Sequence, residues 1–303
     1  MTKALNTTIS GIEFKNPVIA ASGTFNFGKE FSDYYDIGRL GGIAVKGLTR
    51  LSREGNATPR IAETYGGILN SVGLQNPGID HFIKNDLNYL LQKDTVIIAN
   101  IAGNTYEDYC YMAEKASESN VHMIELNISC PNVKAGGVAF GAYPESVLEI
   151  TKAVKKYAKK PLIVKLTPNT ADISLTAKAA EEGGADAISL INTITGMAVD
   201  IKTRRPILAN VTGGLSGPAI KPIALRMVWQ AYNSVSIPIF GMGGIMTSND
   251  VIEFMLCGAS AVQVGTANII NPYAMIDIIN GLEIYVRENK IENIKSIIGA
   301  LRI

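Results

Sequence analysis

Residues 161–192 read PLIVKLTPNTADISLTAKAAEEGGADAISLIN, and this stretch decides the fold class. Two apolar runs, Leu162–Leu166 and Ala187–Asn192, have the length of buried strands and no alternation of polar and apolar residues. Between them lies a helical pattern, Asp172–Glu182, which ends at Gly183–Gly184. Strands of this kind are covered on both faces, so the stretch predicts a parallel β-α-β unit.

The same unit recurs through the rest of the chain. Six further apolar runs have the length of buried strands: Val18–Ser22, Ile43–Gly47, Val96–Asn100, Met123–Ser129, Pro238–Met242 and Ala261–Gly265. Further helical patterns are Thr105–Ser119, Pro144–Lys159, Pro218–Ser234, Ser248–Leu256 and Pro272–Asn289. Eight β-then-α units without a break in composition predict an α/β fold, a single (β/α)8 TIM barrel.

Three connections that follow strands are long: Leu48–Gly78, Cys130–Tyr143 and Thr193–Gly217. Long loops are uncommon unless they serve a function, and the active sites of barrels lie at the C-terminal ends of the strands. We therefore expect these βα loops to cover the C-terminal face and to form the site. Residues 1–16 precede the first strand, and we expect them to form a small hairpin that plugs the bottom of the barrel.

The composition excludes several classes of protein. Apolar residues make up 47% of the 303 residues and charged ones 18%, which excludes a disordered chain. The net charge of +1 gives no support for a nucleic-acid partner, and a short basic run at Lys202, Arg204 and Arg205 is interpreted as a solvated face. The apolar runs are broken by polar residues and prolines, and the N-terminus lacks a secretory pattern. We expect a cytoplasmic protein that neither spans nor binds a membrane.

The cysteines Cys110, Cys130 and Cys257 are odd in number and scattered, with no Cys-x-x-Cys. This pattern argues against a disulfide scaffold, a bound metal or an iron–sulfur cluster held by this chain alone. The run Gly241-Met-Gly243-Gly244 does not complete the G-x-G-x-x-G fingerprint, so no dinucleotide-binding unit is predicted.

Polar and glycine residues gather where the predicted strands end. They are Ser22, Lys46, Asn100, Asn127, Lys165, Asn192, Thr193, Gly243, Gly244, Gly265 and Thr266. Polar groups inside apolar runs cost free energy unless they are paired. Local capping of a loop would explain one such asparagine, but not the whole set at one end of six strands.

The chemistry of this set narrows the ligand. Amides suit a flat heterocycle with C=O and N–H edges, and buried lysines suit negative charge. The glycine-rich ends of strands seven and eight suit a phosphate, which barrels often bind there. The set predicts a flavin mononucleotide enzyme that acts on a heterocycle.

Cys130 lies directly after a buried strand, in the segment NISCPN at residues 127–132. A thiolate can act as a base or a nucleophile, whereas Cys110 and Cys257 lie in helical patterns and are interpreted as inert thiols. Neither His81 nor His122 lies at the C-terminal end of a strand, which argues against a Cys–His hydrolase. Cys130 is therefore favoured as a proton acceptor.

Several motifs together resemble the dihydroorotate dehydrogenase family. NISCPNVK (127–134) with Gly136–Gly137 is similar to its active-site loop, and NSVGLQNP (70–77) is similar to its substrate loop. Further matches in family order are Ala21–Thr24, Val45–Gly47, Ile98–Asn100, Val164–Leu166, Ile191–Thr193, Gly213–Gly217, Gly241–Gly244 and Val264–Thr266. Mild departures occur at Asn26, Ala57 and Thr167, and Asn26 can still adopt the left-handed turn of a glycine. The continuation Lys134–Gly137 resembles the class 1B catalytic subunit.

The resemblance implies a single FMN-binding barrel domain over residues 1–303 that oxidises (S)-dihydroorotate to orotate in pyrimidine biosynthesis. Cys130 would take the C5 proton while C6 gives hydride to N5 of FMN. The residues implied to contact FMN are Ser22, Lys46, Asn100, Asn127, Lys165, Ile191, Gly217, Gly243, Gly244, Gly265 and Thr266. Those implied to contact the substrate are Lys46, Asn70, Ser71, Val72, Gly73, Leu74, Asn127, Asn132, Asn192 and Thr193.

The resemblance also implies partners. The chain would form a homodimer and join a subunit that carries FAD and a [2Fe–2S] cluster, in a heterotetramer that passes electrons to NAD⁺. The alternatives are a fumarate-using class 1A enzyme and a related flavoprotein that reduces pyrimidines. A phosphate-binding aldolase or isomerase with a Schiff base on Lys165 and a non-catalytic scaffold also remain open.

Overall fold

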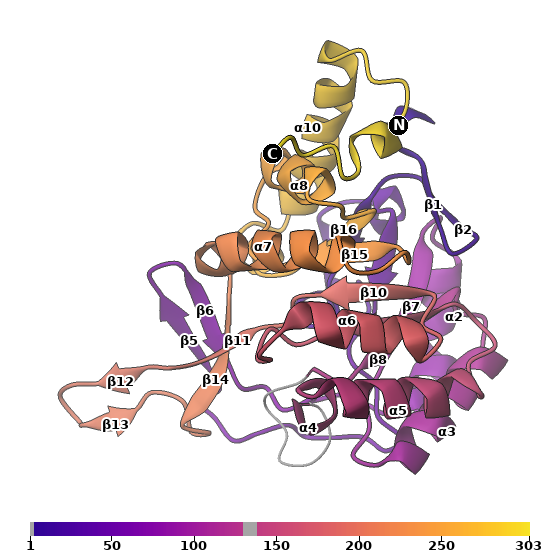
Figure 1. The fold of residues 1–303 in the computed structure, drawn as a ribbon. Helices are drawn as coiled ribbons and strands as arrows, with labels where there is room; N and C mark the ends of the chain where they lie inside the picture. The colour runs from indigo at the N-terminus through magenta and orange to yellow at the C-terminus, as the bar shows by residue number, and fades with distance from the viewer. Residues whose placement is uncertain (1–2, 130–137) are drawn as a thin grey trace.

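The computed structural model describes residues 3–129 and 138–303, and its centre is a closed barrel of eight parallel strands (Figure 1). Around the barrel the order is β10-β15-β16-β3-β4-β7-β8-β9. The strands are β3 (Val18–Ala20), β4 (Gly42–Ala44), β7 (Val96–Ile101), β8 (Met123–Asn127), β9 (Leu162–Lys165), β10 (Ala187–Leu190), β15 (Ile239–Met242) and β16 (Ala261–Val264). Each predicted run overlaps one strand, which confirms the predicted barrel.

Helices pack around the outside of the barrel and bury their apolar faces against it (Figure 1). They are α1 (Ile79–His81) and α2 (Leu87–Leu91), joined by a π-helical turn (Phe82–Asp86), then α3 (Tyr106–Glu118), α4 (Val138–Gly141), α5 (Pro144–Lys155), α6 (Ile173–Glu182), α7 (Lys221–Tyr232), α8 (Ser248–Leu256), α9 (Ala267–Ile270) and α10 (Ala274–Glu288). Short 3₁₀ turns are Lys3–Leu5, Glu30–Asp33, Ile37–Arg39, Pro218–Ile220 and Ile294–Ile297. The connection from β3 to β4 holds only two of these turns, so the first unit lacks the helix that an eightfold repeat predicts.

The two long connections that the structure fully describes are not structureless. They contribute β5 (Ile61–Thr64), β6 (Gly67–Asn70), β11 (Ile194–Met197) and β14 (Thr212–Ser216) to an antiparallel sheet in the order β11-β14-β6-β5. We call this sheet the cap sheet. Asn70 pairs with Gly214 in its register, so residues far apart in sequence meet beside the barrel mouth.

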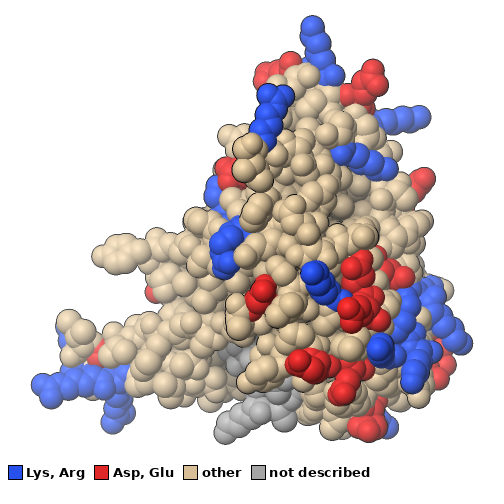
Figure 2. Space-filling view, in the orientation of Figure 1, with Lys and Arg blue, Asp and Glu red and all other residues tan. Residues whose placement is uncertain are grey.

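An arm projects from the cap sheet, built from β12 (Val199–Asp200) and β13 (Arg205–Pro206) (Figure 1). Figure 2 shows basic side chains gathered at its tip. Lys202, Arg204 and Arg205 are exposed there, as the interpretation of a solvated basic run predicted.

The predicted plug is present at the opposite end of the barrel. Strands β1 (Thr7–Ile9) and β2 (Ile12–Phe14) form an antiparallel hairpin. Ile9 and Phe14 are buried against inward-facing residues near the start of the barrel strands, and the ring of Phe14 lies 6.1 Å from that of Phe240. The hairpin therefore closes the bottom of the barrel with apolar contacts.

Within residues 3–129 and 138–303, every helix is too short or too polar to cross a lipid bilayer.

Candidate active site

The inward-facing row of the barrel strands changes from apolar to polar toward the mouth. On β8 this row is Met123, Glu125 and Asn127, because alternate residues of a strand point to the same face. Met123 belongs to the apolar cluster at the plug, whereas Asn127 lines a pocket at the mouth. Glu125 lies between them with no exposed surface.

Glu125 is the centre of a buried hydrogen-bonded layer. Its Oε1 accepts from Ser189 Oγ (2.8 Å) and Gln263 Nε2 (2.5 Å), and its Oε2 accepts from Asn100 Nδ2 (2.5 Å). The ammonium of Lys165 lies 3.9 Å from the same Oε2. A buried carboxylate is stable only with such partners.

Glu125 is not among the site residues predicted from the sequence. A signal was present, because Glu125 is a charged residue within an apolar run and lies two positions before Asn127, on the same face of the strand. Gln263 carries the same signal, since it lies two positions before Gly265.

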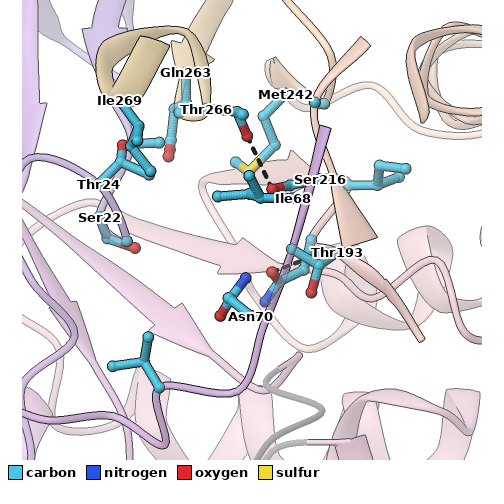
Figure 3. Close-up of a pocket in the computed structure, with 18 of the residues that line it drawn as sticks. Ser22, Thr24, Ile68, Asn70, Thr193, Ser216, Met242, Gln263, Thr266 and Ile269 are labelled. Atoms are coloured by element: carbon cyan, nitrogen blue, oxygen red, sulfur yellow. Dashed lines mark hydrogen bonds between the residues drawn. The ribbon is translucent and has the colours of Figure 1, made fainter. Parts of the chain in front are cut away.

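Above this layer a pocket opens at the C-terminal end of the barrel (Figure 3). Its empty space, open mouth included, is about 1230 Å³. Most of the predicted residues line it: Ser22, Lys46, Asn70, Val72, Gly73, Leu74, Asn127, Lys165, Ile191, Asn192, Thr193, Gly217, Gly243, Gly244, Gly265 and Thr266.

Two predicted residues lie behind the pocket wall rather than in it. Asn100 is fully buried one layer below, where its Oδ1 accepts from Asn127 Nδ2 at 3.2 Å. Ser71 is also fully buried. Cys130 and Asn132 lie outside the described residues.

The chain that leads into Cys130 is held by two asparagines. Asn192 Nδ2 donates to the carbonyl oxygen (3.1 Å) and the Oγ (2.8 Å) of Ser129. The hydroxyl of Ser129 donates in turn to Asn127 Oδ1 at 3.1 Å. These bonds fix Ser129, the residue that precedes Cys130 in the sequence.

Other lining residues were not predicted. They are Ala21, Gly23, Thr24, Gly47, Ile61, Ile68, Ser216, Ile220, Met242, Ile245, Gln263 and Ile269. Ile61, Ile68 and Ser216 belong to the cap sheet, so their approach to the barrel could not be seen without that sheet. The apolar members give the pocket walls against which a flat ring can pack.

The departure at Asn26 leaves the local backbone intact. Asn26 adopts φ of 54°, the left-handed conformation expected of a glycine replacement. Its carbonyl accepts from the backbone N–H of Lys46 at 3.1 Å, which places the lysine at the pocket.

Neither histidine lines the pocket. His122 precedes β8 at the opposite end of the barrel, where its Nδ1 accepts from the N–H of Ile97. Burial lowers the pKa of His122. His81 lies on α1, with its Nδ1 3.4 Å from Asp86. In the described ranges, no three His, Cys, Asp or Glu side chains come together as a metal site.

The glycine ends of β15 and β16 form a cradle. Gly243 and Gly244 have φ of 119° and 80°, and a Cβ on Gly244 would lie 2.8 Å from the backbone nitrogen of Lys221. Among the described residues, the N–H groups of Gly243, Gly244 and Thr266 donate to no backbone carbonyl outside regular elements. Free N–H groups of this kind suit a phosphate.

Two polar atoms on the pocket wall lack a partner within the described residues. Thr24 Oγ1 and Gln263 Oε1 are buried and have no hydrogen-bond partner in the part of the chain that the structure describes. With the cradle, the lysines and the apolar walls, they fit a ligand that joins a phosphate to a flat polar ring. FMN is such a ligand, so the residues present fit this cofactor.

Fold and site together define a (β/α)8-barrel enzyme whose site lies at the C-terminal mouth. The chain matches the family described as "Dihydroorotate dehydrogenase" over residues 4–285. It belongs to the dihydroorotate dehydrogenase family.

Similar proteins carry one name, "Dihydroorotate dehydrogenase B (NAD(+)), catalytic subunit". One from Alkaliphilus metalliredigens (strain QYMF) is 60% identical over 302 residues, covering 99% of this chain and 100% of the relative. One from Thermoanaerobacter pseudethanolicus (strain ATCC 33223 / 39E) is 56% identical, covering 99% of each chain. One from Geotalea daltonii (strain DSM 22248 / JCM 15807 / FRC-32) is 55% identical, covering 99% of this chain and 98% of the relative.

Proposed function

We propose that this chain oxidises (S)-dihydroorotate to orotate with FMN, as a step of pyrimidine biosynthesis. The observation that carries the proposal is the pocket itself, where a glycine cradle, two lysines and several amides share one barrel mouth. The names of the similar proteins supply the substrate.

Oxidation of dihydroorotate removes a proton from C5 and a hydride from C6. When bound, FMN supplies the acceptor for the hydride. Cys130 is the proposed acceptor for the proton, on the strength of the sequence motif. The buried contacts of Ser129 support this role, because they fix the backbone next to Cys130.

The lysines and amides of the pocket have separate proposed roles in binding and charge stabilisation. Lys165 is 5% exposed and sets a positive charge on the pocket floor, where the hydride delivers negative charge. Lys46 faces the same pocket and suits the carboxylate of the substrate. Asn70 of the cap sheet and Thr193 lie close together at the pocket (Figure 3), which Asn192 also lines. Their side chains offer hydrogen bonds to a ring with C=O and N–H edges.

The proposal includes partners. The similar proteins are named as catalytic subunits of an NAD(+) enzyme, and this sequence lacks both a dinucleotide fingerprint and cluster-ligand spacing. We therefore propose a homodimer that joins a subunit with FAD and a [2Fe–2S] cluster, through which electrons reach NAD⁺.

Anaerobic mixing of the purified chain with dihydroorotate tests the function. The expected result is a yellow protein that loses its visible flavin absorbance within the mixing experiment. A colourless protein, or a flavin that dihydroorotate leaves oxidised, would overturn the proposal. A parallel arm with dihydrouracil distinguishes the pyrimidine-reducing alternative, since that substrate lacks the carboxylate.

A further inference from the structure

Gln263 has a buried oxygen that nothing in the described chain satisfies. The residue lies on β16, is 1% exposed and faces the pocket beside Thr266 and Ile269 (Figure 3). Its Nε2 donates to Glu125 Oε1 at 2.5 Å, whereas its Oε1 has no hydrogen-bond partner among the described residues.

The partner of the Nε2 group fixes which way this amide points. An ionised carboxylate can only accept hydrogen bonds, and Glu125 is surrounded by donors from Asn100, Ser189 and Lys165. Gln263 must therefore turn its NH₂ toward Glu125. Its oxygen is left for the pocket, and a buried acceptor without a donor costs about 1–3 kcal/mol.

The position of Gln263 indicates which ligand supplies the donor. Gln263 lies two residues before Gly265 and three before Thr266, on the strand that leads into the glycine cradle. A ligand whose phosphate occupies the cradle passes over this strand end. The substrate contacts proposed above come instead from the cap sheet and from the residues that follow β4 and β10.

We infer that Gln263, oriented by Glu125, accepts a hydrogen bond from FMN and so selects the cofactor. The inference rests on the proposed function. FMN offers two donors close to its flat ring: the single N–H of the oxidised ring, at N3, and the 2′-hydroxyl of the ribityl chain. In both cases a donor of FMN faces the fixed oxygen of Gln263.

The test uses the full chain stripped of flavin and titrated with FMN, 3-methyl-FMN and 2′-deoxy-FMN, followed by quenching of flavin fluorescence. Gln263→Met keeps the side-chain length but removes the acceptor, together with the donor to Glu125, and it should weaken FMN binding by about 5- to 100-fold. In the wild type one analogue should bind more weakly than FMN by a similar factor. That analogue should bind the variant within a few-fold of FMN, because the lost bond is shared. If the donor is the ring N–H, the analogue with weakened binding should be 3-methyl-FMN. If the donor is the ribityl hydroxyl, it should be 2′-deoxy-FMN.

Gln230→Met is the matched control, because Gln230 is half-buried on α7, does not line the pocket, and its side-chain oxygen accepts from Arg226. It should bind all three flavins as the wild type does. Unchanged FMN affinity in Gln263→Met would overturn the inference, and weaker orotate binding in that variant would assign the acceptor to the substrate. Equal binding of the three flavins by the wild type would also overturn it, without need of a folded variant. If the inference on Gln263 fails in one of these ways, reduction of wild-type FMN by dihydroorotate still supports the proposed function. A wild-type protein that binds no FMN would overturn both the inference and the proposed function.

Discussion

At Glu125 a carboxylate without exposed surface accepts hydrogen bonds from residues on three other strands. Removing one donor would leave buried charge uncompensated, which typically costs several kcal/mol. The donors are therefore held in fixed positions, and two of them affect the pocket floor. Asn100 accepts a hydrogen bond from Asn127, which lines the pocket, and Gln263 turns its own oxygen toward the pocket. A single buried charge thus orders groups that act above it.

Replacement of the proposed base should separate chemistry from binding. Cys130→Ser should slow flavin reduction by dihydroorotate by about 10²- to 10⁴-fold, because a hydroxyl is a far weaker proton acceptor than a thiolate. The affinity for FMN should stay within about twofold of the wild type, and rapid-mixing absorbance and fluorescence titration measure the two. Cys110→Ser on α3 is the matched control and should change neither. A reduction rate that survives in Cys130→Ser contradicts the role.

Asn192 lies between the substrate side of the pocket and Ser129. Asn192→Ala removes two hydrogen bonds to Ser129 and the acceptor for the N–H of Thr193. Orotate binding should weaken by roughly tenfold or more, and FMN binding by much less. Titration of the flavin spectrum with orotate gives the first constant and flavin fluorescence the second. Equal losses of the two ligands would show that the site is arranged differently.

At the scale of elements, the barrel strands could be predicted because each is a short apolar run buried on both faces. The cap sheet could not, because its strands are short, half-exposed and rich in glycine, as in Gly67–Asn70 and Thr212–Ser216. The first unit also differs, since the turns of Glu30–Asp33 and Ile37–Arg39 replace its helix. The site residues on the barrel strands could therefore be predicted from the sequence, whereas most of those on the cap sheet could not.

Helix α8 begins with a capping box whose charge gives a pH-dependent stability. Burial acts to raise the pKa of Asp250, but its hydrogen bonds to Lys221 and to the N–H groups of Met246 and Thr247 outweigh this and lower the pKa overall. A carboxyl with a lowered pKa stabilises the fold above its unfolded pKa of about 3.9 and loses that contribution as the pH falls through its folded value.

Asp250→Asn should therefore lower the free energy of unfolding by roughly 1–2 kcal/mol at pH 7. The difference from the wild type should shrink below about pH 4, where the carboxyl of the unfolded chain begins to be protonated, and should vanish below the lower folded pKa. Denaturant unfolding at several pH values measures it. Lys221→Met should reduce the same pH dependence, and a difference that is constant across the range would rule out this account.

At the scale of the whole molecule, the proposed electron path needs more than this chain. We expect the isolated protein to be reduced by dihydroorotate yet to reduce NAD⁺ slowly, because no dinucleotide-binding unit is predicted from its sequence. Steady-state assays with NAD⁺, fumarate and a quinone compare the acceptors. Addition of the FAD and [2Fe–2S] subunit should restore the NAD⁺ rate. Fast NAD⁺ reduction without it would remove the need for a partner, and fast fumarate reduction would favour the class 1A alternative.

The hairpin of Ile9 and Phe14 closes the bottom of the barrel, so ligands reach the pocket from the mouth. FMN and the substrate of the proposed function therefore enter and leave by the same end of the barrel. We expect bound orotate to obstruct the exit of the flavin, so a protein saturated with product should release FMN more slowly than one without product. Accumulated product would then slow the loss of FMN from the enzyme.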